Sequence, residues 1–256
     1  MKKRLDVLLV ERGLAESRAQ AQALVMAGLV RGFDKPGQQV DEGAELSVKP
    51  SPAYVSRGGE KLAHGLDLLG IDPSGLDALD IGASTGGFTD VLLQRGVARV
   101  IALDVGHGQL HPRLRGDSRV VVLERVNARA LTELPFAPQL VVCDVSFISV
   151  RVALPPALKL AAPGWQAVVL VKPQFEAGRR DVGKGGVVRD PSVRGRVLRE
   201  IADAGLGWGA SIVGVVDSGL PGPKGNRELF LHLVQSDHPT LSDDLDERID
   251  AALAAG

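Results

Sequence analysis

Short runs of apolar residues recur between about residue 78 and residue 234, and most of the stretches between them are long enough to form a helix. Such runs predict buried strands, and strands that alternate with helices form a mostly parallel sheet covered on both faces. The sequence therefore predicts an α/β domain with a doubly wound sheet. The seven expected strands are Ala78–Ile81, Val100–Leu103, Val120–Leu123, Leu140–Cys143, Val168–Val171, Ile212–Val216 and Leu229–Val234.

The connection between the last two expected strands is the segment 217–226, which is rich in Gly and Pro. It is too short for a crossover helix, so these two strands are expected to pair antiparallel. A mostly parallel sheet with an antiparallel edge is typical of methyltransferases rather than of dehydrogenases.

Polar side chains follow several of the expected strands directly. In a doubly wound sheet, ligands bind beyond the carboxyl ends of the strands. These residues are therefore the first candidates for a site, and Lys172 together with Asp144 indicates a group-transfer enzyme. The residues at the strand ends are Asp80, Asp104, Asn127, Asp144 and Lys172.

The first part of the chain has a different pattern. Leu5, Leu8 and Leu9 share one face of a short helix, and Ser17 with Gln20 predicts a capping box at the start of a second helix. Short strands and turns follow. We expect a small α+β domain over residues 1–52, a linker over 53–60, the α/β domain over 61–236 and an acidic C-terminal helix over 237–256.

Composition excludes several classes of protein. The 256 residues carry a net charge of −1, but the last 20 contain six acidic residues and one arginine, so the remainder is mildly basic and can bind a polyanion. The N-terminus reaches Glu11 before an apolar signal segment can develop, and no apolar run is long enough to span a membrane. The lone Cys143 excludes an intramolecular disulfide. A cytoplasmic protein is expected.

The N-terminal segment RLDVLLVERGLAESRAQAQALVMAGLVRG resembles the small RNA-binding domain that is named after a ribosomal small-subunit protein. In that family, exposed residues of paired helices contact the RNA backbone. The resemblance implies salt-dependent contacts between basic side chains and phosphates. The matching residues are Lys2, Lys3, Arg4, Arg12, Arg18 and Arg31.

The segment DIGASTGGFT leads from the first expected strand into a helix. It contains neither the dinucleotide pattern G-x-G-x-x-G nor a triphosphate-binding G-K-[ST]. It resembles the S-adenosylmethionine loop of RNA ribose methyltransferases, in which glycines let the backbone approach the cofactor. The resemblance implies a cofactor site made of Asp80, Gly82, Ala83, Ser84, Thr85, Gly86, Gly87, Asp104, Asn127 and Asp144.

Agreement extends over about residues 3–234, through VSRGGEKL, DVGHGQL, VVLERVNAR, SFIS, LVKPQFE and LPGPKGN. On these motifs the chain resembles the TlyA family, which is often labelled hemolysin and has an FtsJ-like, Rossmann-like class I methyltransferase domain. The resemblance implies S-adenosylmethionine-dependent 2′-O-methylation of cytidine in ribosomal RNA. It also implies a catalytic set of Lys61, Asp144, Lys172 and Glu228.

Lysine suits the activation of a ribose hydroxyl, because its amine can accept the proton or stabilise the developing alkoxide. Methyl transfer from a sulfonium is an in-line displacement that needs no metal. His107 and His111 are four residues apart but lack a nearby third ligand, so packing or substrate contact is expected of them rather than zinc.

The segment 179–186 is basic and rich in glycine, and it is either a lid over RNA or a solvated loop. Glycine hinges and three cations in a short stretch favour the lid. The cations are Arg179, Arg180 and Lys184.

Two other functions remain open at this point. A membrane-lytic protein is disfavoured by the lack of a spanning segment, and a non-catalytic ribosome assembly factor is disfavoured because all four catalytic positions are filled. Ribosomal RNA or ribosomal subunits are the expected partners, with no metal and no stable membrane association; the sequence assigns no oligomeric state.

Overall fold

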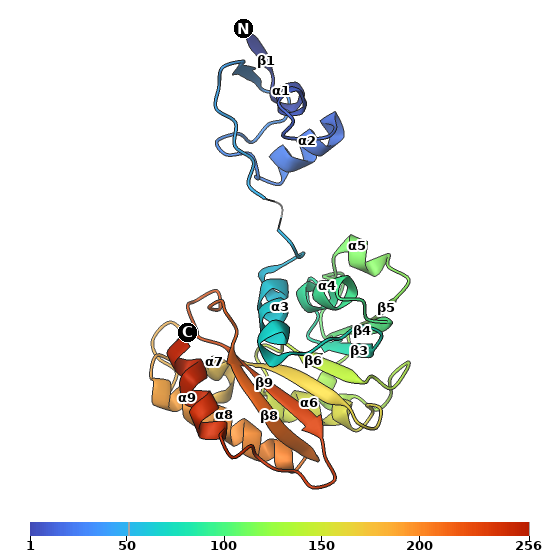
Figure 1. Ribbon diagram of the computed structural model, residues 1–256, viewed down its shortest axis with the longest axis vertical. Coiled ribbons are helices and arrows are strands. Elements are labelled where there is room, and N and C mark those ends of the chain that lie inside the picture. Colours follow the sequence, from blue (N-terminus) through green and yellow to red (C-terminus); the bar gives the residue numbers. More distant parts are fainter. Residues whose placement is uncertain (51, 256) are drawn as a thin grey trace. The chain divides into compact units, whose positions relative to one another are not determined.

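The computed structural model describes residues 1–50 and 52–255. Ser51, near the end of the expected first domain, and Gly256, at the end of the expected acidic helix, lie outside the described residues. The chain divides into two compact units, residues 1–53 and 54–256 (Figure 1). Helix α3 (Arg57–Leu69) begins within the segment 53–60 that was expected to be a linker.

The first unit contains two helices and a two-stranded sheet. Strand β1 (Lys2–Arg4) pairs antiparallel with β2 (Gln39–Asp41), and helices α1 (Leu5–Glu11) and α2 (Arg18–Met26) follow β1 in the chain. Its small core is made of aliphatic side chains from both helices and the strand region. The buried members are Leu5, Leu9, Ala15, Ala21, Val25, Val30 and Val40.

The expected capping interaction at the start of α2 is present in a modified form. The Ser17 hydroxyl accepts a hydrogen bond from the Gln20 backbone N–H at 3.2 Å. The Gln20 side chain accepts from the backbone N–H of Glu16, one residue before the cap, at 2.5 Å. Two backbone donors at the helix start are thereby satisfied, which is what a capping box achieves.

The second unit is built on a seven-stranded sheet in the order β5-β4-β3-β6-β7-β9-β8. The pairs from β5 to β7 are parallel, whereas β9 pairs antiparallel with both β7 and β8. The expected α/β sheet with an antiparallel edge is confirmed. The strands are β3 (Asp77–Ile81), β4 (Arg99–Asp104), β5 (Val120–Glu124), β6 (Leu140–Cys143), β7 (Gln166–Val171), β8 (Ala210–Asp217) and β9 (Leu229–Gln235).

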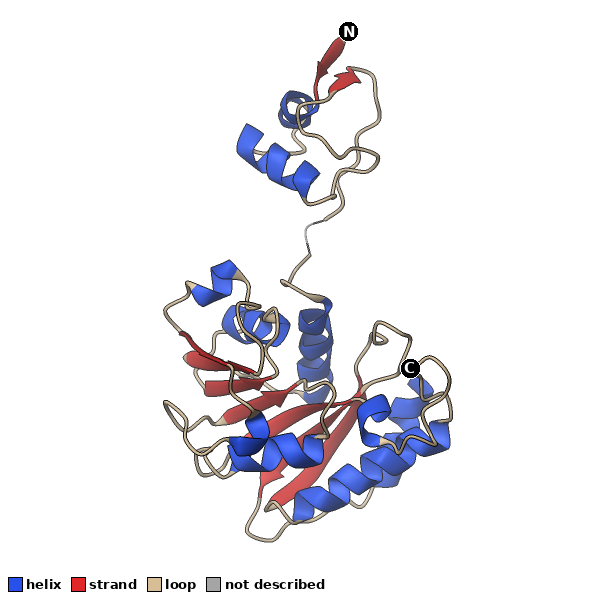
Figure 2. Ribbon diagram, turned by 180° about the vertical axis from the view of Figure 1, so that it is seen from behind, coloured by secondary structure: helices blue, strands red, loops and turns tan. Residues whose placement is uncertain are grey.

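Helices cover both faces of this sheet (Figure 2). Alternate residues of β3 divide between two cores, with Ala78 facing one and Leu79 the other. Helices α3, α4 (Gly87–Gln94) and α5 (Pro112–Arg115) contribute to the first core. Helices α6 (Val150–Leu158), α8 (Pro191–Leu206) and α9 (Leu245–Ala255) contribute to the second. The short α7 (Pro173–Glu176) and the 3-10 turn η1 (Ala128–Ala130) complete the unit.

The acidic C-terminal segment folds onto the sheet as an amphipathic helix. Leu245 and Ile249 of α9 are buried in the second core, and Leu253 packs against it. Leu241, within the segment 237–256 that was expected to be helical, lies before the helix and forms an isolated bridge with Ile212. Among the residues that the structure describes, no helix is both long enough and apolar enough to cross a membrane.

A glycine determines how closely α3 approaches the sheet. A Cβ atom on Gly65 would lie 2.6 Å from Cδ2 of Phe230, a fully buried ring on β9. The missing side chain therefore provides the space for this ring. Gly195 of α8 is different, because a Cβ there would meet only side-chain atoms at 3.3 Å or more.

Gly65→Ala is expected to lower the free energy of unfolding by roughly 1–3 kcal/mol through overpacking, although alanine favours helix by about 1 kcal/mol. Gly195→Ala is the matched control, and it should leave stability unchanged or raise it. Urea unfolding of both variants gives the comparison. If Gly65→Ala is as stable as the control, the Phe230 ring does not occupy this space.

Candidate active site

The loop between β3 and α4 carries the glycines that the sequence singled out. Gly82 has a φ of +84°, and a Cβ there would lie 2.6 Å from the backbone oxygen of Asp144. Gly86 has a φ of +97° and immediately precedes α4, where a Cβ would overlap Leu114 and Leu110. Both positions therefore require glycine, both for backbone conformation and for space.

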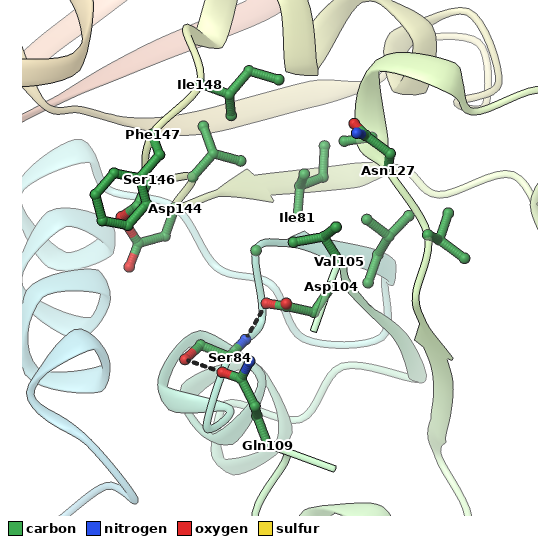
Figure 3. A pocket seen from close by; sticks show the side chains of 15 residues that line it. Ile81, Ser84, Asp104, Val105, Gln109, Asn127, Asp144, Ser146, Phe147 and Ile148 are labelled. Carbon is green, nitrogen blue, oxygen red and sulfur yellow. Dashed lines mark hydrogen bonds between the residues drawn. The ribbon is translucent and has the colours of Figure 1, made fainter. Parts of the chain in front are cut away.

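Asp104, at the end of β4, holds this loop from the side. Its two carboxylate oxygens accept hydrogen bonds from the backbone N–H of Ser84 at 2.8 Å and of Gly106 at 2.6 Å. Ser84 has a φ of +49°, and its hydroxyl donates to Gln109 at 3.3 Å (Figure 3). The Asp104 carboxylate is thus fixed in orientation at the carboxyl end of the parallel strands.

A cleft of about 430 Å³ lies beyond the carboxyl ends of β3, β4, β5 and β6, a size typical of small-molecule sites. Asp144 and Phe147 lie on one side of the cleft and Asn127 on the other (Figure 3). The Asn127 side-chain oxygen accepts from the Arg129 N–H at 3.2 Å and so caps η1. Among the described residues its Nδ2 group has no partner, so it is available to a ligand.

Asp80 lies beneath the glycine loop and is fully buried. One carboxylate oxygen accepts from the backbone N–H and the hydroxyl of Thr89, at 2.9 and 2.6 Å. The other oxygen has no hydrogen-bond partner within the described part of the chain. Burial raises the pKa of Asp80 to about 7, and the nearby carboxylates of Asp144 and Asp104 act in the same direction.

These observations indicate which ligand fits the cleft. Asp104 and Asp144 line the cleft, and the third acid, Asp80, is buried beneath the glycine loop with one carboxylate oxygen unpartnered among the described residues. Such a site favours a cationic ligand that also offers hydroxyl groups. S-adenosylmethionine, with its sulfonium, amine and ribose diol, has this chemistry.

Lys172 immediately follows β7 and is mostly buried. Its Nζ lies 2.5 Å from Oδ1 of Asp144 and donates to the Ser146 hydroxyl at 2.9 Å. The contact with Asp144 is an ion pair by distance, although its angles are not those of a hydrogen bond. The strand end and the loop after β6 are therefore joined through this amine.

Lys61 reaches the same end of the sheet from α3. Its Nζ lies 2.5 Å from Oε2 of Glu228, and the two side chains are only 8% and 2% exposed. Oε1 of Glu228 accepts from the Gln174 amide at 3.2 Å. Removal of one partner from such a buried pair leaves an uncompensated charge, so each residue holds the other in place.

A second cleft of about 340 Å³ adjoins the first and has Lys172 and Glu228 in its lining. Ser146 and Phe147 line both clefts. The Phe147 ring lies 5.0 Å from that of Phe175, yet the side chain is 91% exposed and the residue has a φ of +64°. Our sequence analysis did not identify Phe147, because neither its left-handed backbone nor its exposure can be read from SFIS.

The expected lid lies between α7 and α8. Arg179, Arg180 and Lys184 are all exposed there. The end of this segment is attached to the loop before β9, because the buried Asn226 side chain accepts from the Val188 N–H at 2.9 Å and donates to the Gly186 carbonyl at 2.8 Å.

The six other basic residues expected to contact RNA lie in the first unit and differ in their partners. Lys3 pairs with Glu11 at 2.9 Å, and Arg12 donates to backbone carbonyls including that of Ala44 at 2.6 Å. Arg4 and Arg18 share the carboxylate of Asp6. The remaining two are the exposed Lys2 and Arg31.

The two histidines have protein partners of their own. Nδ1 of His107 lies 2.8 Å from the Glu124 carboxylate, and His111 caps α5 by accepting from the Arg113 N–H at 3.2 Å. Within residues 1–50 and 52–255, no group of three or more His, Cys, Asp or Glu side chains is arranged to hold a metal ion.

The sheet order, the glycine loop and the acid at the end of β4 together define a methyltransferase of the Rossmann-like class. The FtsJ-like methyltransferase model matches residues 54–235, and the S4 domain model matches residues 3–31. The chain belongs to the FtsJ-like methyltransferases and, among them, to the TlyA family.

Individual relatives agree with this assignment. The chain is 47% identical over 264 aligned positions to the 16S/23S rRNA (cytidine-2′-O)-methyltransferase TlyA of Mycobacterium tuberculosis H37Rv, covering 99% of this chain and 98% of that protein. A solved structure from Streptococcus thermophilus, provisionally named a hemolysin, is 42% identical, with a TM-score of 0.76 over 98% of this chain and 95% of that one.

A more distant structure shows the fold alone. The S-adenosylmethionine dependent methyltransferase from Mesorhizobium loti is 16% identical and has a TM-score of 0.52 over 68% of this chain and 98% of that one.

The raised pKa of Asp80 predicts an unusual dependence of stability on pH. Its folded-state pKa of about 7 exceeds the ordinary value of 3.8, so the folded state retains a proton that the unfolded state loses. The contribution of Asp80 to stability is therefore complete below pH 3.8 and is lost as the pH rises through 7.

Asp80→Asn should become more stable relative to the wild type as the pH rises, by roughly 1.4 kcal/mol per unit between pH 5 and 7. Asparagine can still accept both hydrogen bonds from Thr89. Urea unfolding of the ligand-free proteins at pH 5, 6, 7 and 8 measures the difference. A difference that is constant across this range would show that the Asp80 pKa is ordinary.

Proposed function

We propose that the protein is an S-adenosylmethionine-dependent ribose 2′-O-methyltransferase that acts on cytidine in ribosomal RNA. The observation that carries the proposal is the ion pair between Lys172 and Asp144, whose Nζ and Oδ1 atoms are 2.5 Å apart. Asp144 lines the first cleft, which suits the cofactor, and Lys172 lines the second cleft next to it. A methyl donor and a hydroxyl acceptor can therefore meet at this pair.

The first cleft supplies contacts for each part of the cofactor. The carboxylate of Asp104 accepts hydrogen bonds from the ribose hydroxyls, Asn127 contacts the adenine edge, and the backbone from Gly82 to Gly87 faces the methionine part. The carboxylate of Asp144 makes this end of the cleft favourable for positive charge. When bound, S-adenosylmethionine supplies an electrophilic methyl group on its sulfonium.

Lys172 activates the acceptor. A 2′-hydroxyl becomes a better nucleophile as its proton leaves; the amine of Lys172 accepts that proton, and the resulting ammonium group stabilises the oxygen. Asp144 and Ser146 hold Nζ in position, at 2.5 and 2.9 Å. The buried ion pair of Lys61 and Glu228 completes the catalytic set, and Glu228 lines the same cleft as Lys172.

The second cleft suits a nucleoside drawn out of the RNA chain. The exposed Phe147 ring provides a face for base stacking at the border of the two clefts, next to Lys172. Arg179, Arg180 and Lys184 then contact the RNA backbone from the neighbouring loop, as a lid. Cytidine and ribosomal RNA are inferred from the activity named for the mycobacterial relative. With ribosomes as the target, we expect the protein in the cytoplasm.

Methyl transfer can be measured directly. The purified protein is incubated with methyl-labelled S-adenosylmethionine and either ribosomal subunits or deproteinised rRNA, and labelled nucleosides are identified by mass spectrometry. We expect label on the 2′-oxygen of cytidine. Label on a base, or an absence of label from every RNA offered, would refute the proposed function, and leakage from liposomes under the same conditions would favour the lytic alternative.

Lys172→Ala should lower the rate of methyl transfer at least about 100-fold, the usual contribution of a positioned proton-transfer group. Binding of S-adenosylmethionine, measured by calorimetry, should persist because Lys172 does not line the first cleft. Lys159→Ala is the matched control, since Lys159 is exposed just beyond α6 and should be dispensable. Normal transfer by Lys172→Ala would remove this residue from the catalytic set.

A further inference from the structure

A buried carboxylate in the first unit holds two arginines. Asp6 is fully buried, whereas the side chains of Arg4 and Arg18 are 44% and 56% exposed. Arg4 binds Asp6 through two parallel hydrogen bonds, Nε to Oδ1 and Nη2 to Oδ2, both at 3.0 Å. Arg18 donates from Nε and Nη2 to the same Oδ2, both at 3.2 Å.

The Asp6 carboxylate is fully engaged. Gln22 of α2 is the third residue that donates to Oδ2, at 2.8 Å. The hydrogen bonds from Arg4, Gln22 and Arg18 keep the pKa of Asp6 far below its ordinary value, with Arg4 the largest cause, so the group stays ionised. One negative charge therefore faces two positive ones, and the cluster keeps a net positive charge at the surface of the unit.

The orientation of the guanidinium groups leaves donors free. Both arginines use Nε and Nη2 toward Asp6, and within the described residues neither Nη1 has a hydrogen-bond partner. The Arg4 group also lies close to Gly37, where a Cβ would be 3.2 Å from its Nη2 and 3.4 Å from its Nη1. Two oriented guanidinium groups with free donors match the oxygens of a phosphate.

The other cations of this unit are arranged differently. Lys3 lies 2.9 Å from Glu11 and 3.6 Å from Glu42, so acidic groups offset its charge. Arg12 donates hydrogen bonds to the backbone carbonyls of Glu42 and Ala44, and so connects the end of α1 to the loop after β2. Similar basic residues in the sequence thus differ in their capacity to bind a new anion.

We propose that Asp6 is a positioning residue that organises Arg4 and Arg18 into a preformed fork for RNA backbone phosphates. This inference rests on the proposed function, because it takes RNA as the ligand. Preorganisation lowers the entropic cost of ordering two long side chains when RNA binds. The alternative hypothesis is that the cluster only stabilises the fold of the first unit.

The two hypotheses predict opposite changes in RNA affinity for Asp6→Asn. This substitution removes a negative charge, so electrostatics alone would strengthen binding to a polyanion. If Asp6 orients the fork, binding should instead weaken, by roughly tenfold. The experiment measures filter binding of the full-length protein to deproteinised 16S and 23S rRNA between 50 and 200 mM KCl, with the thermal unfolding midpoint recorded for each variant.

Three further variants complete the test. Arg18→Lys keeps the charge but loses the fork, and it should also weaken binding. Arg18→Gln should reduce the slope of log affinity against log salt by about 1. Lys159→Gln is the matched control: it removes one exposed positive charge just beyond α6 and should leave that slope unchanged. At saturating rRNA, Asp6→Asn should retain the wild-type kcat for methyl transfer with a raised KM, which a general loss of folding would not produce.

The outcomes separate cleanly. Binding of folded Asp6→Asn that equals or exceeds that of the wild type overturns the proposal, as does a loss of slope in Lys159→Gln equal to that in Arg18→Gln. If Asp6→Asn does not fold, Arg18→Lys decides: weakened binding supports the fork, and unchanged binding overturns it. Failure of the proposed function would differ from all of these, because the wild type itself would then label no RNA.

Discussion

The close approach of two loops at the carboxyl end of the sheet is the constraint on which the site depends. The backbone of Gly82, after β3, passes so near the carbonyl of Asp144, after β6, that a Cβ would lie 2.6 Å from it. This contact fixes the position of the glycine loop relative to the loop that carries Asp144. Asp144 in turn forms the ion pair with Lys172 after β7. The ends of β3, β6 and β7 therefore together fix the positions of these charged groups.

Charges are sorted across the site. Asp104 and Asp144 line the first cleft, while Lys172 lines the second cleft together with Glu228, the partner of Lys61. This separation suits a reaction in which a cationic donor meets a hydroxyl that is losing its proton. Each lysine is held by a carboxylate, so its amine keeps a defined position in a largely buried setting.

Backbone strain concentrates at the same place. Among the described residues, three that are not glycine have positive φ values, and each follows the carboxyl end of a different strand: Ser84, Arg125 and Phe147. Strained conformations of this kind persist only where the surroundings hold them, and they cluster at functional sites. Here they turn the Ser84 N–H toward Asp104 and leave the Phe147 ring exposed between two clefts.

The sequence by itself determined the sheet, because apolar runs and glycine turns are local signals; every expected strand is present to within two residues at either end. It also identified Asp104, Asp144 and Lys172 as strand-end residues, since their positions follow from the strands. Only the tertiary structure decided that Lys61 reaches Glu228, 167 positions away, and that Arg4 and Arg18 share Asp6 whereas Arg12 binds backbone carbonyls. Residue type determines what a side chain can bind, but packing between distant segments determines which partner it meets.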